Sequence, residues 1–171
     1  MSELILRPLT IADANLTWKW RNQEGVQTYY SNHSFEVTLQ DELNWYAKNI
    51  EAVTNTRIFG VEVKGELVGI TSLKNIQPIH KLAEFAILID EAYSGKGYGT
   101  NACAHTLAIA FGELNLHRVF LKVRTDNIPA IRIYEQCGFK KEGTLKEDFF
   151  KAGTYHDQFI MAILKAEYKR R

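Results

Sequence analysis

The sequence feature that most constrains the fold is the segment 82–107, where a strand pattern, a glycine-rich turn and a helix pattern follow one another. Residues 83–89 form an apolar, β-favouring run that predicts a buried strand. Three glycines then occupy every second position of 95–99, and the apolar periodicity of 100–114 predicts a helix directly after them. Glycines let backbone N–H groups approach a ligand closely, and a helix N-terminus adds unpaired N–H donors. The segment therefore predicts a phosphate-binding loop.

The spacing of these glycines excludes two better-known phosphate loops. A Walker A loop needs four residues between its first Gly and a Gly-Lys-Ser/Thr group, and this chain lacks that arrangement. The dinucleotide fingerprint is also absent, because Gly95, Gly97 and Gly99 lack its final spacing and no early β-α-β unit surrounds them. A tight strand-to-helix connection is the alternative interpretation of the turn taken alone, since flexible turns use glycine as well.

The composition is that of an ordinary globular protein. Of 171 residues, 46% are hydrophobic and 24% are charged, which suits one domain over residues 1–171 with a sizeable core. The net charge of +1 shows none of the basic excess expected of a nucleic-acid-binding protein. The N-terminal stretch is not a signal peptide, and no apolar run approaches membrane-spanning length. We therefore expect a cytoplasmic protein that binds neither nucleic acid nor membranes.

The two cysteines, Cys103 and Cys137, have no metal-ligand spacing, so no metal site is predicted. They indicate small buried thiols in a reducing compartment. A catalytic cysteine is the sharper alternative, but no activating His lies at a recognisable distance along the chain.

The order of predicted elements indicates an α+β fold. Strands are expected at 4–8, 57–63, 67–75, 83–90, 119–123, 140–147 and 155–164. Helices are expected at 12–21, after a capping residue at 38, at 100–114 and from 129. The early strands are antiparallel, and a parallel crossover surrounds the glycine turn. The prediction is one mixed sheet with helices on both faces.

The second half of the chain, about 80–168, resembles the GNAT acyltransferase superfamily at several points in the same order. The glycine turn is similar to that superfamily's pyrophosphate loop, Gln/Arg-x-x-Gly-x-Gly/Ala, with Ser94 where Gln or Arg is usual. The other segments that carry the resemblance are 83–85 (AEF), 114–118 (LNLHR), Asn127, 134–139 (YEQCGF), 142–145 (EGTL) and 153–157 (GTYHD). This half is most similar to bacterial spermidine acetyltransferases and nearly as similar to ribosomal-protein N-terminal acetyltransferases. In the first half, 20–22 and 38–45 are similar to acetyltransferases of nucleotide-linked amino sugars.

The resemblance implies a single GNAT-type domain with acetyl-coenzyme A as co-substrate and no metal. Its sheet would be mixed, mostly antiparallel and twisted, with a V-shaped splay between the two central parallel strands. Residues 1–80 would form mainly the acceptor side, and 80–168 would bind acetyl-coenzyme A and carry catalysis. The residues implied to bind acetyl-coenzyme A are Phe85, Ile87, Leu88, Ile89, Ser94, Gly95, Lys96, Gly97, Tyr98, Gly99, Thr100, Asn127, Ala130 and Tyr134.

Tyr134 and Glu84 are the candidate catalytic residues. Tyr134 matches a tyrosine that lies beside the coenzyme sulfur in this superfamily, where a phenol can protonate the leaving thiolate. The alternative for Tyr134 is a helix aromatic packed in the core. Glu84, on the central strand, is a candidate to accept the proton of an ammonium substrate, directly or through a water. Its alternative is a strand carboxylate in a structural hydrogen bond.

The candidate acceptor-binding residues are Trp20, Tyr30, His33, Glu84 and Tyr155. The resemblance implies transfer to the primary amine of a small molecule, a polyamine such as spermidine first. Polyamine acetyltransferases typically carry an acidic pair before the second helix, whereas this chain has Asn32 and His33 there. Acetylation of a protein N-terminus, acetylation of a nucleotide-linked amino sugar and a non-catalytic acyl-coenzyme A-binding module stay open. Among partners, the resemblance also implies further copies of this chain, as a dimer or larger homo-oligomer.

Overall fold

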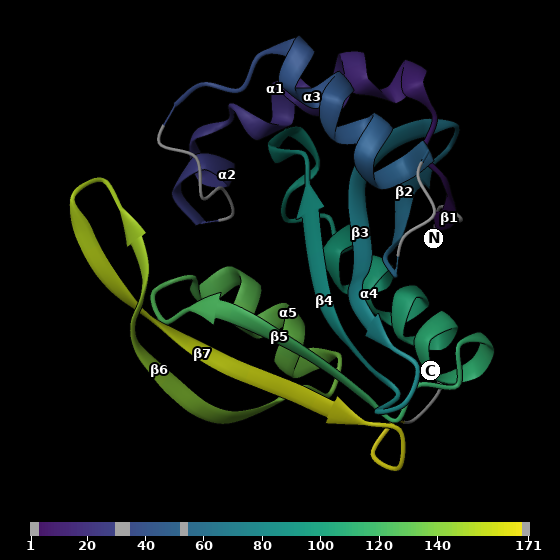
Figure 1. Cartoon of the computed structure of the whole chain (residues 1–171), viewed down its shortest axis with the longest axis vertical. Helices are drawn as coiled ribbons and strands as arrows, with labels where there is room; N and C mark the ends of the chain where they lie inside the picture. The colour runs from purple at the N-terminus through teal and green to yellow at the C-terminus, as the bar shows by residue number, and fades with distance from the viewer. Residues whose placement is uncertain (1–3, 30–34, 52–54, 169–171) are drawn as a thin grey trace.

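The computed structural model describes residues 4–29, 35–51 and 55–168 as one seven-stranded sheet with helices on both faces (Figure 1). The strands are β1 (Leu4–Pro8), β2 (Arg57–Val63), β3 (Glu66–Gln77), β4 (Leu82–Ile89), β5 (Arg118–Arg124), β6 (Lys140–Lys151) and β7 (Thr154–Leu164). The α-helices are α1 (Ala14–Arg21), α2 (Glu24–Tyr29), α3 (Leu39–Tyr46), α4 (Tyr98–Ala108) and α5 (Ile128–Gln136). Shorter helical turns are η1 (Ile11–Asp13), η2 (Ala47–Glu51), η3 (Glu91–Tyr93) and η4 (Ile109–Glu113).

The sheet has the order β1-β2-β3-β4-β5-β7-β6. Its ladders are antiparallel except for the central pair, β4 and β5, which run parallel. This pair is joined over three rungs only, 82–84 with 118–120, although β4 continues to Ile89 and β5 to Arg124. Beyond these rungs the two strands separate, as Figure 1 shows. The predicted mixed sheet with a V-shaped splay is therefore confirmed.

Two helical layers cover opposite faces of the sheet. Trp20 of α1 and Tyr46 of α3 pack with Leu88 of β4 in one core cluster. On the other face, Phe85 of β4 packs with residues of α4 and α5. Successive side chains of a strand point to opposite faces. Glu84 and Leu88 therefore share the face covered by α1 and α3, while Phe85 belongs to the other face.

Local sequence signals set most of the element boundaries. Thr38 begins α3 with a reciprocal cap, in which the Asp41 N–H donates to Thr38 Oγ1 at 3.2 Å and the Thr38 N–H donates to the Asp41 carboxylate at 2.9 Å. Gly97, with φ of +79°, is the N-cap of α4, so this helix begins two residues earlier than predicted. The strand predicted at 140–147 is longer, because β6 continues to Lys151 through two register shifts.

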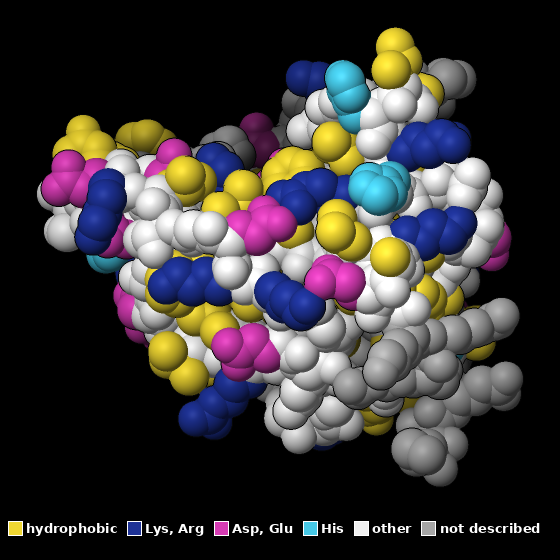
Figure 2. All heavy atoms as spheres, turned by 90° about the horizontal axis from the view of Figure 1, so that it is seen from below, with side chains coloured by type: hydrophobic (Ala, Val, Ile, Leu, Met, Phe, Trp, Pro, Cys, Tyr) yellow, Lys and Arg dark blue, Asp and Glu magenta, His cyan; other side chains and the backbone are white. Residues whose placement is uncertain are grey.

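The surface carries charges of both signs. Figure 2 shows basic and acidic side chains interspersed on the face seen from below. Ion pairs between partly exposed side chains of the described residues include Arg118–Glu142 and Lys122–Asp148. Within the described ranges, no helix is long and apolar enough to cross a membrane.

Candidate active site

A cleft of about 700 Å³ opens where β4 and β5 separate. Its walls come mainly from β4, β5, α2 and α5, with further residues from β3, β6 and β7. Of the residues predicted to bind coenzyme or take part in catalysis, those that line it are Glu84, Phe85, Ile87, Leu88, Ile89, Ser94, Gly99, Asn127, Ala130 and Tyr134. Ten predicted residues distributed over 84–134 thus meet in one cavity.

The β5-facing edge of β4 supplies main-chain groups to this cleft. Past Glu84, β4 keeps its ladder with β3 but has no ladder partner on β5. Backbone N–H and C=O groups need partners when they are buried. An extended ligand lying in the splay can therefore pair with β4 as an added strand would, which fits the pantetheine arm of coenzyme A.

The glycine turn has an open backbone next to the cleft: Ser94 and Gly99 line the cleft, whereas the other residues of the turn predicted to bind coenzyme, Gly95, Lys96, Gly97, Tyr98 and Thr100, do not. Gly95 and Gly97 have φ of +74° and +79°, and a Cβ added at either would meet no atom within 4 Å. The space over the turn is thus free for a ligand, and the N-terminus of α4 follows at Tyr98. Such a site suits the pyrophosphate of coenzyme A.

The remaining loop residues are held by the protein itself. Lys96 Nζ donates to the carbonyl of Ala92 at 3.0 Å, and Thr100 Oγ1 donates to Gln136 at 3.2 Å. Gly99 has a packing role, because a Cβ there would lie 2.9 Å from Cδ1 of Ile133. The Lys96 ammonium and the Thr100 hydroxyl therefore each have a protein partner, and the backbone amides of the turn are further donors available to phosphate.

Tyr134 lies on α5 with its ring fixed between two aromatic side chains. It is 8% exposed, and its ring meets Phe85 and Phe139 edge to face at centroid distances of 6.1 and 5.9 Å. Asn127 is the N-cap of the same helix, accepting from the Ala130 N–H at 3.3 Å through Oδ1. Its amide NH₂ is the part of Asn127 that a ligand in the cleft can meet. Tyr134 packs against core aromatic residues and also lines the cleft, so the two interpretations of this residue do not exclude each other.

Glu84 occupies the last rung that joins β4 to β5, opposite Phe120. On its other side it faces Lys74 of β3 across the antiparallel ladder. Within the described part of the chain, the Glu84 carboxylate has no hydrogen-bond or ion-pair partner. The structural hydrogen bond considered as its alternative role is therefore not found among these residues.

Arg124 ties the end of β5 to α2, near Tyr29 and Phe149, which line the cleft. Its guanidinium is 6% exposed and donates to Asp126 at 3.0 Å and to the Thr28 carbonyl at 3.0 Å. It also lies over the rings of Tyr29 and Phe149, at 5.0 and 5.7 Å. The hydrogen bond from Arg124 lowers the pKa of Asp126, which favours the charged carboxylate.

A second cavity of about 270 Å³ adjoins the first on the α1–α3 face of the sheet. Its lining residues are Thr17, Arg21, Trp45, Asn49, Thr56, Ile58, Ile70, Ser72, Lys74, Asn75 and Leu88. Lys74 and Leu88 line both cavities. We call this second space the Arg21 cavity.

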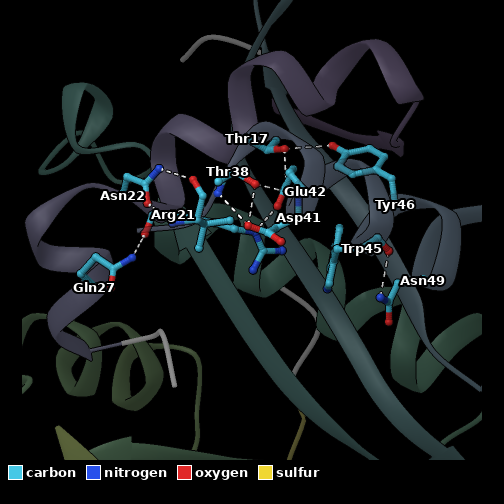
Figure 3. A network of polar contacts seen from close by, with 11 residues as sticks. Thr17, Arg21, Asn22, Gln27, Thr38, Asp41, Glu42, Trp45, Tyr46 and Asn49 are labelled. Atoms are coloured by element: carbon cyan, nitrogen blue, oxygen red, sulfur yellow. Dashed lines mark hydrogen bonds and ion pairs between the residues drawn. The ribbon is translucent and has the colours of Figure 1, made fainter. Parts of the chain in front are cut away.

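A buried polar network holds Arg21 in place (Figure 3). Its Nε forms an ion pair with Glu42, and its guanidinium lies 4.5 Å from the ring centroid of Trp45. Glu42 is 1% exposed and also accepts from Thr17 Oγ1 at 2.6 Å. Burial raises the pKa of Tyr46, which hydrogen-bonds Thr17, to about 12. Tyr46 therefore stays neutral at neutral pH. Arg21 supplies the positive charge that pairs with the Glu42 carboxylate.

We expect Arg21→Leu to lower the free energy of unfolding by about 3 kcal/mol, because it leaves the Glu42 carboxylate buried without a cation. The partial exposure of the Arg21 side chain, 20%, places the loss at the lower end of the range for broken buried pairs. Urea denaturation measures it, with Lys19→Leu, an exposed position of the same helix, as control. Adding Glu42→Gln to Arg21→Leu should restore part of the loss. An unchanged unfolding midpoint in Arg21→Leu would show that Glu42 does not need this cation.

Comparison with known proteins identifies the family to which the chain belongs. Residues 3–140 match the family model of the acetyltransferase (GNAT) domain. The chain belongs to the GNAT acetyltransferase family. It is accordingly an enzyme, an N-acetyltransferase that uses acetyl-coenzyme A, and the open glycine turn and the splayed strands fit that co-substrate.

Two curated GNAT relatives span nearly the whole chain. Spermidine N(1)-acetyltransferase of Vibrio cholerae is 34% identical over 171 residues, covering 99% of this chain and 98% of its own. YdaF of Bacillus subtilis, a candidate ribosomal N-acetyltransferase, is 32% identical over 170 residues. The match covers 96% of this chain and 86% of YdaF.

Solved GNAT structures agree with the fold. The crystal structure of spermidine N-acetyltransferase from Vibrio cholerae in complex with CoA and spermine superposes with a TM-score of 0.89 at 34% identity, covering 96% of this chain and 97% of that one. A dodecameric structure of the Vibrio cholerae enzyme superposes with a TM-score of 0.81 at 34% identity, covering 95% and 94% of the two chains.

The residues predicted to bind the acceptor do not meet in one cavity, unlike most of those predicted to bind the coenzyme. Trp20 is 1% exposed and packed in the core, so its predicted contact with an acceptor finds no support. Tyr155 is 60% exposed near the tip of the β6–β7 hairpin, against Phe150, and lines neither cavity. Tyr30 and His33 lie outside the described residues. Glu84 alone of the remaining set lies in the cleft.

Sequence reasoning did not identify Arg21 and Lys74 as cavity-lining residues. Arg21 lies one turn after Thr17 on α1, and both line the same cavity. Lys74 lies two residues after Ser72 on β3, so the two side chains point to the same face of the sheet. The four-residue spacing of Thr17 and Arg21 on a helix and the two-residue spacing of Ser72 and Lys74 on a strand are sequence signals that could have grouped these residues.

Proposed function

We propose that this GNAT enzyme acetylates the primary amine of a small molecule by direct attack on acetyl-coenzyme A, with polyamines such as spermidine as the first acceptor class. The observation that carries the proposal is that one cleft contains two suitable groups: the Glu84 carboxylate, which has no hydrogen-bond or ion-pair partner among the described residues, and the phenol of Tyr134, which packs against Phe85. Similarity over nearly the full length to the Vibrio cholerae spermidine N(1)-acetyltransferase supports the acceptor class. Glu84 and Tyr134 are the proposed catalytic residues.

The proposed chemistry needs three proton transfers around one substitution. An ammonium acceptor first gives a proton to Glu84, directly or through one water, and becomes nucleophilic. Its nitrogen then attacks the thioester carbonyl, so that a C–N bond forms and the C–S bond breaks. Tyr134 donates its hydroxyl proton to the leaving sulfur and regains one, through solvent, from the acetylated nitrogen. The low exposure of Tyr134 shields its proton transfer to the sulfur from bulk water.

The proposal treats 1–171 as one acyl-coenzyme A N-acyltransferase domain. Residues 80–168 would hold acetyl-coenzyme A and the catalytic groups, and 1–80 would form mainly the acceptor side. We also propose a homo-oligomer, supported by the dodecameric Vibrio cholerae structure. The free thiols of Cys103 and Cys137 support a reducing compartment such as the cytoplasm.

The test of this function is thiol release from acetyl-coenzyme A against a panel of acceptors. The panel contains spermidine, spermine, a ribosomal-protein N-terminal peptide and a nucleotide-linked amino sugar. We expect turnover with a small amine, polyamines being the first to examine. Turnover with the peptide alone would favour the ribosomal alternative, which the similarity to YdaF supports. Coenzyme binding without thiol release for any acceptor would overturn the proposed transfer.

Glu84→Gln should lower kcat/KM at neutral pH by about tenfold or more, because the ammonium acceptor loses its proton acceptor. The loss should shrink as the pH approaches the pKa of the acceptor amine, since the amine then arrives neutral. A pH profile of kcat/KM measures this, with Glu113→Gln, an exposed carboxylate beyond α4, as control. A loss of the same size at every pH would indicate that Glu84 has only a structural role.

A further inference from the structure

We infer that Gln158 determines acceptor specificity by accepting a hydrogen bond from a second nitrogen of the acceptor, far along its chain from the amine that reacts. The inference rests on the proposed transfer to a small-molecule amine and adds a contact that distinguishes among such amines. It begins from the burial of Gln158, which lines the cleft and is 9% exposed. Among the described residues, the side-chain amide of Gln158 has no hydrogen-bond partner. A buried amide without a partner requires an explanation.

The neighbours of Gln158 in the sheet do not supply the missing partner. Gln158 of β7 pairs with Arg124 of β5 and with Leu145 of β6. The guanidinium of Arg124 donates to Asp126 and to the carbonyl of Thr28, and the side chain of Leu145 has no polar atom. Burial of an unpaired amide destabilises the fold, and a ligand that hydrogen-bonds the amide removes this cost. A ligand in the cleft is therefore the partner that suits Gln158.

The register of the sheet places Gln158 on the acceptor side of the cleft. Glu84 lies opposite Phe120, and Arg124 follows Phe120 by four residues on β5. Side chains two residues apart on a strand lie on one face, as do side chains that are paired across adjacent strands. Glu84 and Gln158 therefore share one face of the sheet. Tyr134 comes from α5, which packs on the opposite face.

The same register separates Gln158 from the reacting centre. At about 3.3 Å per residue, the four residues from Phe120 to Arg124 put Gln158 about 13 Å along the sheet from Glu84. An acceptor with its reacting amine at Glu84 therefore needs a long chain to reach Gln158. Linear polyamines have this form, because aliphatic spacers separate their amines. A protonated polyamine nitrogen has only N–H donors, so Oε1 is the atom of Gln158 that it meets.

The charges of the cleft agree with a cationic acceptor. Its described lining has three carboxylates, Glu84, Glu91 and Asp148, and two ammonium groups, Lys74 and Lys122. Lys122 is paired with Asp148 at 2.8 Å. The lining therefore has no excess of positive charge that would repel a polyamine. The neutral amide adds a hydrogen bond whose strength depends on where the second nitrogen lies.

The kinetic test compares spermidine with octylamine, which has a similar length but no second nitrogen. Gln158→Met keeps an unbranched side chain of similar length and removes the amide. We expect it to lower kcat/KM for spermidine by about tenfold, mainly through a higher KM, and to change kcat/KM for octylamine by no more than about twofold. Gln158→Glu keeps an acceptor oxygen and should retain wild-type kcat/KM for spermidine. Gln77→Met, exposed at the end of β3 and outside both cavities, is the matched control and should change neither value.

The comparison of the two amines separates a contact with the acceptor from a role in folding. A loss that affects spermidine alone would support the inference. An equal loss for spermidine and octylamine in Gln158→Met would assign Gln158 a structural role and overturn the inference.

Calorimetric titration of spermidine into protein saturated with coenzyme A separates this inference from the proposed function. We expect Gln158→Met to weaken spermidine binding by about tenfold. Weakened binding in this variant, with no thiol release from the wild-type protein, would support the role of Gln158 and overturn the proposed transfer. Thiol release with spermidine that Gln158→Met leaves unchanged would overturn the inference and leave the proposed function standing. Absence of spermidine binding to the wild-type protein would also overturn the inference.

Discussion

Tyr134→Phe is expected to lower kcat by about a hundredfold or more while affinity for coenzyme A changes by no more than about twofold. The hydroxyl is the proposed proton donor to the leaving sulfur, and phenylalanine keeps the edge-to-face contacts with Phe85 and Phe139. Steady-state thiol release gives kcat, and calorimetric titration with coenzyme A gives the affinity.

The matched control for this change is Tyr93→Phe. Tyr93 donates its hydroxyl to Glu66 at 2.7 Å on the surface and does not line the cleft. Removal of the Tyr93 hydroxyl should leave kcat nearly unchanged. Full activity in Tyr134→Phe would show that another group, or water, protonates the thiolate, and a matching loss in Tyr93→Phe would show that the effect is not specific to the cleft.

Gly97→Val is expected to weaken binding of coenzyme A by about tenfold or more. The backbone at Gly97 has φ of +79°, which a β-branched residue adopts only with strain, and the new side chain would fill the open space over the turn. Calorimetric titration with coenzyme A measures the affinity, and urea denaturation measures the stability separately.

Gly65→Val supplies the control for backbone strain. Gly65 has a comparable φ of +83° and equally open surroundings, but it lies in the turn between β2 and β3. The two variants should lose similar stability, and only Gly97→Val should lose coenzyme affinity. Unchanged affinity in Gly97→Val would exclude the glycine turn as the pyrophosphate site.

The glycine turn proposed to hold the coenzyme could be predicted from sequence because its residues are close along the chain. Gly95, Gly97 and the start of α4 form the loop by local geometry, whatever surrounds them. Asn127 and Thr38 begin their helices through contacts within three residues. The order of these elements, strand, turn and helix, then fixed the α+β class.

The acceptor half depended on packing that sequence patterns do not specify. Trp20 and Arg21 are neighbours on α1, about 100° apart around the helix axis, and either could have faced a ligand. Tertiary packing turned Trp20 into the core and Arg21 toward the cavity. A periodic pattern reveals that a helix has a buried face, but not which side chain at its border meets the neighbouring cavity.

By itself, the sequence determined the strands, the helix caps and the glycine turn, since these follow from interactions over a few residues. Only the tertiary structure decided that β4 and β5 part after Glu84, that Lys74 lies opposite Glu84, and that Arg21 is held between Glu42 and Trp45. These contacts join residues far apart in the chain, and their register is set by how whole layers pack against one another.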